Sequence, residues 1–271
     1  MRDILGMTAH IQPMNRIQQA FQQDKKLLNI YFTAGYPRLD DTVPILRALA
    51  EAGADLIEIG MPFSDPLADG PVIQASSTVA LHNGMNMRVL FGQLTDIRAT
   101  VPDTPILLMG YLNPVMQFGV ENFCREAAAA GVDGVILPDL PLDDYVAEYQ
   151  DIFRRHNLRP VFLITPQTAP ERIRRIDELT ESFLYLVSGP GTTGSGAVQA
   201  EGVQDAYFQR IEAMKLRNPR LVGFGISDKK SFDNACQYAE GAIIGSALIR
   251  TLEGAEDAPA AAASFVSSVI K

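Results

Sequence analysis

Short apolar runs alternate with segments of helical spacing along the whole chain. Eight runs read as buried β-strands, at residues 28–34, 55–60, 105–111, 134–139, 160–165, 183–188, 221–225 and 241–245. Most intervening segments repeat apolar residues with the period of a helix, and several end at a glycine suited to a helix C-cap. Nearly continuous apolar strands joined by helices predict a parallel sheet covered on both faces.

Eight such units in 271 residues favour a closed (β/α)8 TIM barrel, an α/β fold, over an open doubly wound sheet. The segment that starts at Met14 predicts a short N-terminal helix with Ile17 and Phe21 on one face. We therefore expect one catalytic barrel domain over 14–271, with extra helical segments in its βα loops, and an N-terminal extension over 1–13.

Composition narrows the function classes. The net charge is −9 and no Lys/Arg-rich stripe occurs, which argues against binding to nucleic acid. No run of about 18 apolar residues could span a bilayer, and the N-terminus lacks the order of a signal peptide. Cys124 and Cys236 lack metal or redox spacing and fit buried positions in a reducing compartment. We expect a cytoplasmic protein.

Two carboxylates mark the second strand and the loop that follows it. Glu58 interrupts an apolar run, so burial should raise its pKa toward the range of a general acid or base, whereas Asp69 on the loop should stay ionised. Active sites of (β/α)8 barrels lie at the carboxyl ends of the strands, where both residues fall. Two alternatives remain open: a structural salt bridge for Glu58, and a helix N-cap role for Asp69.

Glycine turns and aromatic residues indicate a phosphorylated, partly apolar substrate. The seventh and eighth runs end in GFGIS and IGSAL, each a turn that we expect to open a helix and to bind an anion through backbone N–H groups, with Gly194 closing the same pocket. Aromatic side chains that could enclose a flat ring, or belong to the core, are Tyr31, Phe32, Tyr111, Tyr185 and Phe224.

Other chemistries have weaker support. The three histidines form no ligand cluster with the acids, so no metal site is expected. No G-x-S-x-G motif occurs, and the absence of lysine from all eight runs disfavours a Schiff-base aldolase. The sequence thus predicts acid–base chemistry on a phosphorylated substrate.

Seven motifs in order resemble the tryptophan synthase α subunit family. They are TAGYP, IEIGMPFSDPLADGPVIQ, GYLNP, LPDLP, SGPGTTG, GFGIS and IGSAL, and the likeness extends from about Met14 to Lys271. The resemblance implies a barrel that cleaves indole-3-glycerol phosphate to indole and glyceraldehyde 3-phosphate without a cofactor of its own. It also implies an α2β2 heterotetramer in which a β subunit, dependent on pyridoxal phosphate, receives the indole.

The resemblance implies a role for each matching position. Glu58 is similar to the family's catalytic acid/base and Asp69 to its partner acid. The other matches are Tyr185 and Thr193 in the substrate pocket, Gly194, Gly225, Gly245 and Ser246 in the phosphate site, and Asp65 and Asn113 at the β-subunit contact. This chain departs from many relatives at Tyr36 and at Gly189-Pro190, which affects what can be expected of the sixth loop.

Two other functions are compatible with the same fold. Another indole- or ribose-phosphate enzyme would generally need a lysine or cysteine acid/base at a strand end, which this chain lacks. A non-catalytic barrel that only binds a partner would have no need of both acids and the phosphate turns.

Overall fold

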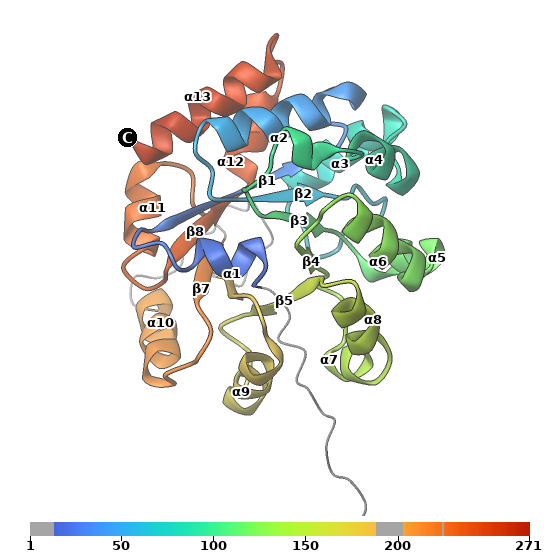
Figure 1. The fold of residues 1–271 in the computed structure, drawn as a ribbon. Helices are drawn as coiled ribbons and strands as arrows, with labels where there is room; N and C mark the ends of the chain where they lie inside the picture. The colour runs from blue at the N-terminus through green and yellow to red at the C-terminus, as the bar shows by residue number, and fades with distance from the viewer. Residues whose placement is uncertain (1–13, 188–202, 224) are drawn as a thin grey trace, which may run out of the picture.

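The computed structural model describes residues 14–187, 203–223 and 225–271, and in them eight parallel strands close into a barrel (Figure 1). The strands are β1 (Leu27–Thr33), β2 (Leu56–Gly60), β3 (Ile106–Met109), β4 (Gly134–Ile136), β5 (Arg159–Ile164), β6 (Leu184–Val187), β7 (Arg220–Gly223) and β8 (Gly241–Ile244). Each pairs with the next along the chain, and β1 pairs with β8. The predicted (β/α)8 barrel and its eight strand positions are confirmed.

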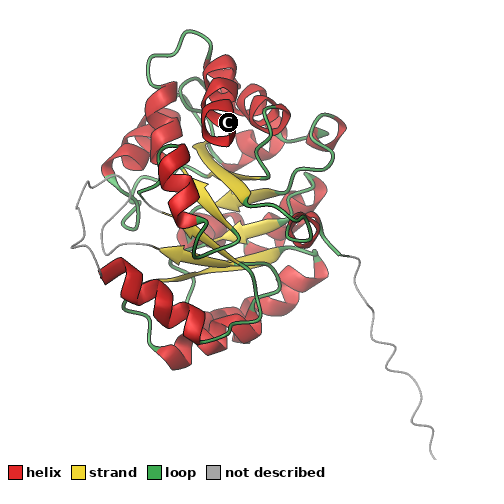
Figure 2. Cartoon of the chain, turned by 90° about the vertical axis from the view of Figure 1, so that its left-hand side faces the viewer, coloured by secondary structure: helices red, strands yellow, loops and turns green. Residues whose placement is uncertain are grey.

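Helices surround the barrel on the outside (Figures 1 and 2). They are α2 (Thr42–Glu51), α3 (Pro71–His82), α4 (Met87–Gln93), α5 (Leu112–Phe118), α6 (Val120–Ala129), α7 (Leu142–Asp144), α8 (Gln150–Arg155), α9 (Pro170–Leu179), α10 (Val203–Ala213), α11 (Lys229–Ala235), α12 (Ser246–Leu252) and α13 (Ala258–Ile270). Single-turn segments are η1 (Leu39–Asp41), η2 (Ile97–Ala99) and the π-helical η3 (Tyr145–Tyr149). α4 and α5 are extra helices within βα connections, as predicted.

Alternate strand residues fill the barrel interior. The buried cluster inside it comprises Ile17, Ala20, Leu27, Leu56, Leu107, Ile136, Val161, Phe183, Tyr185, Val187, Leu221 and Ile243. A second, larger cluster packs the outer faces of the strands against the helices. Because side chains alternate along a strand, Asn29 and Tyr31 of β1 share the inward face with Leu27.

The predicted N-terminal helix is α1 (Arg16–Ala20), shorter than its apolar pattern suggested. Asn15 and Gln18 form a capping box that fixes its start, with the Asn15 side chain accepting from the Gln18 backbone N–H at 3.2 Å. Ile17 and Ala20 are buried in the cluster inside the barrel. The ring centroids of Phe21 and Phe183 lie 5.6 Å apart. α1 therefore covers the amino-terminal end of the barrel (Figure 1).

A paired carboxylate holds this end together. Asp133, just before β4, is 4% exposed and forms ion pairs with Arg16, at 3.0 Å, and with Arg98. Its Oδ2 also accepts the backbone N–H of Ile106 at 3.0 Å. The charge is thus satisfied by two cations and one amide, as a buried carboxylate requires.

Cys124 and Cys236 are free thiols and both are buried, as predicted. None of the described helices has the length and apolar character needed to cross a membrane.

Candidate active site

Glu58 lies in the middle of β2 with its side chain wholly buried, at 0% exposure. It is in register with Tyr31 on β1 and Leu107 on β3. Its Oε1 accepts a hydrogen bond of 2.6 Å from Nδ2 of Asn29, whereas Oε2 has no hydrogen-bond partner among the described residues. Burial raises the pKa of Glu58 to about 8, against a smaller lowering by the Asn29 amide.

The surroundings of Glu58 do not support the alternative of a structural salt bridge. The ion pairs of the described residues do not include it, and its neighbour is a neutral amide. The carboxyl group is therefore a proton-carrying group in the neutral pH range rather than half of a buried ion pair.

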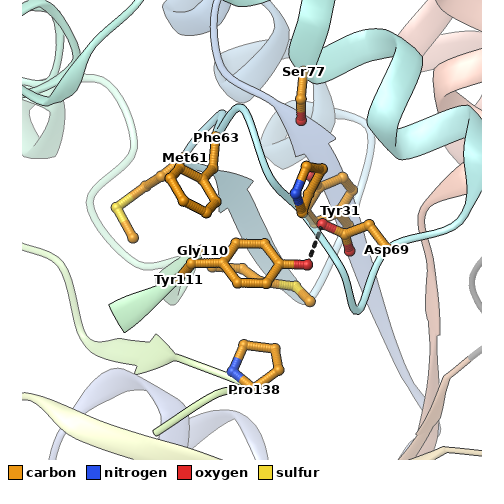
Figure 3. Close-up of a pocket in the computed structure, with 10 residues that line it drawn as sticks. Tyr31, Met61, Phe63, Asp69, Ser77, Gly110, Tyr111 and Pro138 are labelled. Atoms are coloured by element: carbon orange, nitrogen blue, oxygen red, sulfur yellow. Dashed lines mark hydrogen bonds between the residues drawn. The ribbon is translucent and has the colours of Figure 1, made fainter. Parts of the chain in front are cut away.

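Asp69 lies in the loop between β2 and α3 and is 9% exposed. Its Oδ2 accepts a hydrogen bond of 2.9 Å from the hydroxyl of Tyr111 (Figure 3). That hydroxyl in turn accepts a hydrogen bond of 3.0 Å from the backbone N–H of Ala68. Burial raises the pKa of Asp69 to about 6, and the Tyr111 hydroxyl opposes the rise. The group is thus mostly ionised at neutral pH, although the loop encloses it more than its sequence suggested.

The N-cap alternative for Asp69 is wrong. α3 begins at Pro71, its N-cap is Gly70, and no side chain caps it. The carboxylate of Asp69 turns instead toward Tyr111 (Figure 3).

Tyr31 and Tyr185 complete a cluster with the two acids. Burial raises the pKa of both phenols well above the usual range, and the charges of Asp69 and Glu58 raise both further. Glycine makes room for each ring: a Cβ at Gly60 would lie 2.1 Å from the Tyr31 hydroxyl, and one at Gly223 would lie 2.4 Å from that of Tyr185. Two carboxyls and two phenols therefore converge at the carboxyl-terminal end of the barrel.

A cavity opens beside Asp69 (Figure 3). It is lined by Tyr31, Met61, Phe63, Pro66, Asp69, Ser77, Met109, Gly110, Tyr111 and Pro138. The rings of Phe63 and Tyr111 lie 5.4 Å apart, centroid to centroid. This wall of aromatic and sulfur-containing side chains around one carboxylate has the composition of a site for a mainly apolar group that carries one hydrogen-bond donor. Glu58 is not among the lining residues, but it is in register with Tyr31, which is one of them.

The two glycine turns differ from each other. Gly245 is the N-cap of α12 and Ser246 its first residue, and no side chain caps that helix, so its first N–H groups are available to an anion. Gly225, with φ +77°, follows β7, but the next helix begins only at Lys229 and is capped by the Asp228 carboxylate. The expectation that GFGIS itself opens a helix is therefore wrong, because α11 begins only after the motif and Asp228 is its N-cap.

The remaining predicted residues fall in two groups. Asp65 and Asn113 are exposed, on the loop after β2 and in α5 respectively. Thr193, Gly194 and Phe224 lie outside the described residues, as does the 1–13 segment. Within the described ranges, no three His, Cys, Asp or Glu side chains come together as a metal site would require.

Reasoning from sequence missed three polar residues near the acids. Asn29 contacts Glu58, and the Thr33 hydroxyl lies 3.3 Å from that of Tyr31 and 2.7 Å from that of Ser76. The signal for Asn29 was present, since it interrupts an apolar strand just as Glu58 does. Ser76 gave no such signal, because a serine on a helix is ordinary.

Comparisons with known proteins agree with this geometry. The family model for the tryptophan synthase alpha chain matches residues 17–269. The tryptophan synthase alpha chain of Flavobacterium psychrophilum is 54% identical over 94% of this chain and 100% of its own length, and that of Parabacteroides distasonis is 53% identical over 95% and 100%.

Solved structures give the same result. The tryptophan synthase subunit alpha of Legionella pneumophila superposes with a TM-score of 0.85 at 33% identity, covering 94% of this chain and 97% of that one. A chain of Mycobacterium tuberculosis tryptophan synthase gives 0.84 at 30% identity over 94% and 96%. The fold, the buried acids and the relatives agree, and the chain belongs to the tryptophan synthase alpha chain family.

Proposed function

We propose that Glu58 and Asp69 carry the acid–base chemistry by which this tryptophan synthase alpha chain cleaves indole-3-glycerol phosphate. The observation that supports this most is the pair of buried carboxyls on β2 and its loop, with pKa values raised by burial to about 8 and about 6. Near neutral pH the first mainly holds its proton and the second is mainly ionised, so the two can take different roles.

The reaction needs a proton at indole C3 before the carbon–carbon bond can break. Glu58 donates this proton, and the ring becomes an indolenine with positive charge on nitrogen. Asp69 accepts the ring N–H and stabilises that charge. Glu58, now a carboxylate, takes the proton of the glycerol hydroxyl next to the ring. The bond between C3 and that carbon breaks, its electrons return to the ring, and indole and glyceraldehyde 3-phosphate result.

The pocket residues orient the substrate for these steps. Tyr31, Tyr111 and Tyr185 would enclose the indole ring, with Thr193 and Phe224 assigned to the same pocket by their sequence positions. The phosphate would bind the backbone N–H groups of Gly245 and Ser246, whose helix lacks a side-chain cap, together with Gly194 and Gly225. No cofactor is needed in this subunit for proton transfers of this kind.

The direct test is indole release by Glu58→Gln and Asp69→Asn variants. General acid–base groups contribute roughly 10² to 10⁴ in rate, so kcat should fall by about that factor in each, with little change in KM. Asp65→Asn, which removes an exposed acid from the same loop, is the matched control and should keep the activity of the isolated chain. Near wild-type turnover in either variant would show that the assigned roles are wrong.

We further propose a β subunit as partner, in an α2β2 assembly, with pyridoxal phosphate bound only by that subunit. Asp65 and Asn113 are exposed at the end of the barrel that bears the acids, which suits a contact through which indole passes onward. Indole release should rise when the β subunit is added, and a double Asp65→Ala, Asn113→Ala variant should lose that rise while keeping its basal rate. We also assign the chain to the cytoplasm, consistent with two buried free cysteines.

A further inference from the structure

Asn29 is a polar residue in a place where packing alone favours an apolar one. It lies on the inward face of β1 at 0% exposure, two residues after Leu27, which faces inward as well. Its Nδ2 donates to Oε1 of Glu58 at 2.6 Å, while its Oδ1 has no hydrogen-bond partner in the described part of the chain. A buried amide with one group unsatisfied is destabilising, and a leucine, which has the same branched side-chain shape, would avoid that cost.

The surroundings make this contact specific. The other strands turn apolar side chains into the barrel interior, including Leu56, Leu107, Ile136, Val161, Leu221 and Ile243. Among the described residues, the side-chain amide of Asn29 is the group that donates a hydrogen bond to the Glu58 carboxyl group. Both residues lie on rigid, adjacent strands, so the contact has little freedom to rearrange.

We propose that Asn29 is a positioning residue for the cleavage reaction: its side-chain amide fixes Oε1 of Glu58 and leaves Oε2 to exchange protons with the substrate. This inference rests on the proposed role of Glu58. Asn29 itself does not touch the substrate, because it lies on the side of Glu58 away from the cavity, two residues before Tyr31.

The contact has an electrostatic consequence as well as a geometric one. A donor N–H stabilises the carboxylate more than the protonated acid, so Asn29 lowers the pKa of Glu58 against the larger effect of burial. Without the amide, Glu58 would hold its proton to a higher pH and would be a poorer proton donor to indole C3 in the first step of the reaction.

Three other titratable groups of the described residues face Glu58. They are Tyr31 from β1, Tyr185 from β6 and Asp69 from the loop after β2. Both phenols have raised pKa values and stay neutral through pH 8, and Asp69 titrates near pH 6. The alkaline limb of the kcat/KM profile therefore reports Glu58, separately from Asp69 and from the substrate phosphate, which titrates near about pH 6.

The test compares wild type with Asn29→Leu, which keeps the branching of the side chain at Cγ and removes the donor. We expect the alkaline limb of kcat/KM to move up by about one pH unit, the value of a lost hydrogen bond to a charged group. We also expect kcat to fall about tenfold from lost orientation, with KM unchanged. An unmoved limb with unchanged kcat in a folded variant would overturn the proposal.

A second variant and a control separate positioning from packing. Asn29→Asp keeps the shape but places two carboxyls together, so they should share one proton and the alkaline limb should move up further than in the leucine variant. Leu27→Val alters packing on the same face of β1 and should leave the limb where it is. If Leu27→Val shifts the limb equally, Asn29 acts through packing and the proposal fails.

One measurement needs no variant. In the wild-type protein, the side-chain amide resonances of Asn29 should shift with pH, with a midpoint near 8, as Glu58 loses its proton. Resonances that do not move between pH 6 and 10 would contradict the contact. The underlying role of Glu58 is tested separately: an active Glu58→Gln enzyme refutes the proposed function, whereas an inactive one with an unmoved limb in the Asn29 variants refutes only this inference.

Discussion

The barrel buries a carboxylate at each end, and the two have opposite partners. At the amino-terminal end, Asp133 is held by Arg16 and Arg98. At the carboxyl-terminal end, Glu58 meets the neutral amide of Asn29 and no described cation. Both carboxyl groups are buried, but only Asp133 has cations beside it, and at Glu58 burial raises the pKa to about 8.

Within one fold, a buried carboxyl group that holds elements together thus differs from one that is proposed to exchange a proton in the reaction. A buried acid with its partners in place joins elements together, as Asp133 joins α1, η2 and β3. A buried acid short of partners destabilises the folded state and is useful only if the reaction needs its proton.

Removal of the structural acid should have the largest effect on stability. Asp133→Ala leaves Arg98 largely buried without its partner, and breaking a buried pair in this way costs roughly 3 to 5 kcal/mol. Urea denaturation should show this loss, while kcat for the folded fraction changes less than twofold. A loss below about 1 kcal/mol would mean that the charge network does not hold this end.

Removal of the chemical acid should have the opposite sign. The pKa of Glu58 is about 8 in the folded protein against an ordinary 4.5, so its destabilisation is absent below pH 4.5, grows as the pH rises from 4.5 to 8, and is fully present above 8. At pH 9, urea denaturation should therefore show Glu58→Gln to be more stable than wild type by roughly 2 to 4 kcal/mol. At pH 4 the two proteins should be equally stable. Equal stability of the two proteins at pH 9 would contradict the raised pKa.

The Tyr111 hydroxyl should tune the second acid. Tyr111→Phe removes the donor to Asp69, so the pKa of Asp69 should rise above 6 and the acid limb of kcat/KM should move up with it. At neutral pH kcat/KM should fall about tenfold, the value of a hydrogen bond to a charged group. Tyr207→Phe, which loses a hydrogen bond of 2.9 Å to the Ile164 carbonyl, is the matched control and should leave the limb in place.

The smallest effect is expected at the exposed partner of Asp133. The Arg16 side chain is 35% exposed, and its pair with Asp133 is partly screened by solvent. Arg16→Gln should cost about 1 kcal/mol or less in urea denaturation. A cost as large as that of Asp133→Ala would assign the stabilising role to α1 rather than to Arg98.

Much of the architecture was predictable because strand patterns are local. The β2 run was expected at 55–60 and is observed at Leu56–Gly60, and Glu58 was expected to be buried because it interrupts that run. The burial of Asp69 was not predictable, since it depends on Tyr111, 42 residues further along the chain. Likewise, the helix after GFGIS starts late because Asp228 provides a cap there.

The contact between Asn29 and Glu58 shows the same limit. Each residue stood out alone as a polar interruption of an apolar strand, but their pairing follows from the β1–β2 register and from side-chain reach, which single-strand patterns do not contain. Sequence identified which strands carry chemistry, and the structure identified which side chains adjust it.

Glu58 is buried with no cation of the described residues beside it, and its pKa is therefore raised to about 8. Carboxyl carbon NMR of the substrate-free protein tests it directly, with Glu58→Gln used to assign the signal. The account predicts a Glu58 midpoint near pH 8. A midpoint near the ordinary 4.5 would contradict it, because the carboxyl group would then be as well solvated or paired as one in water.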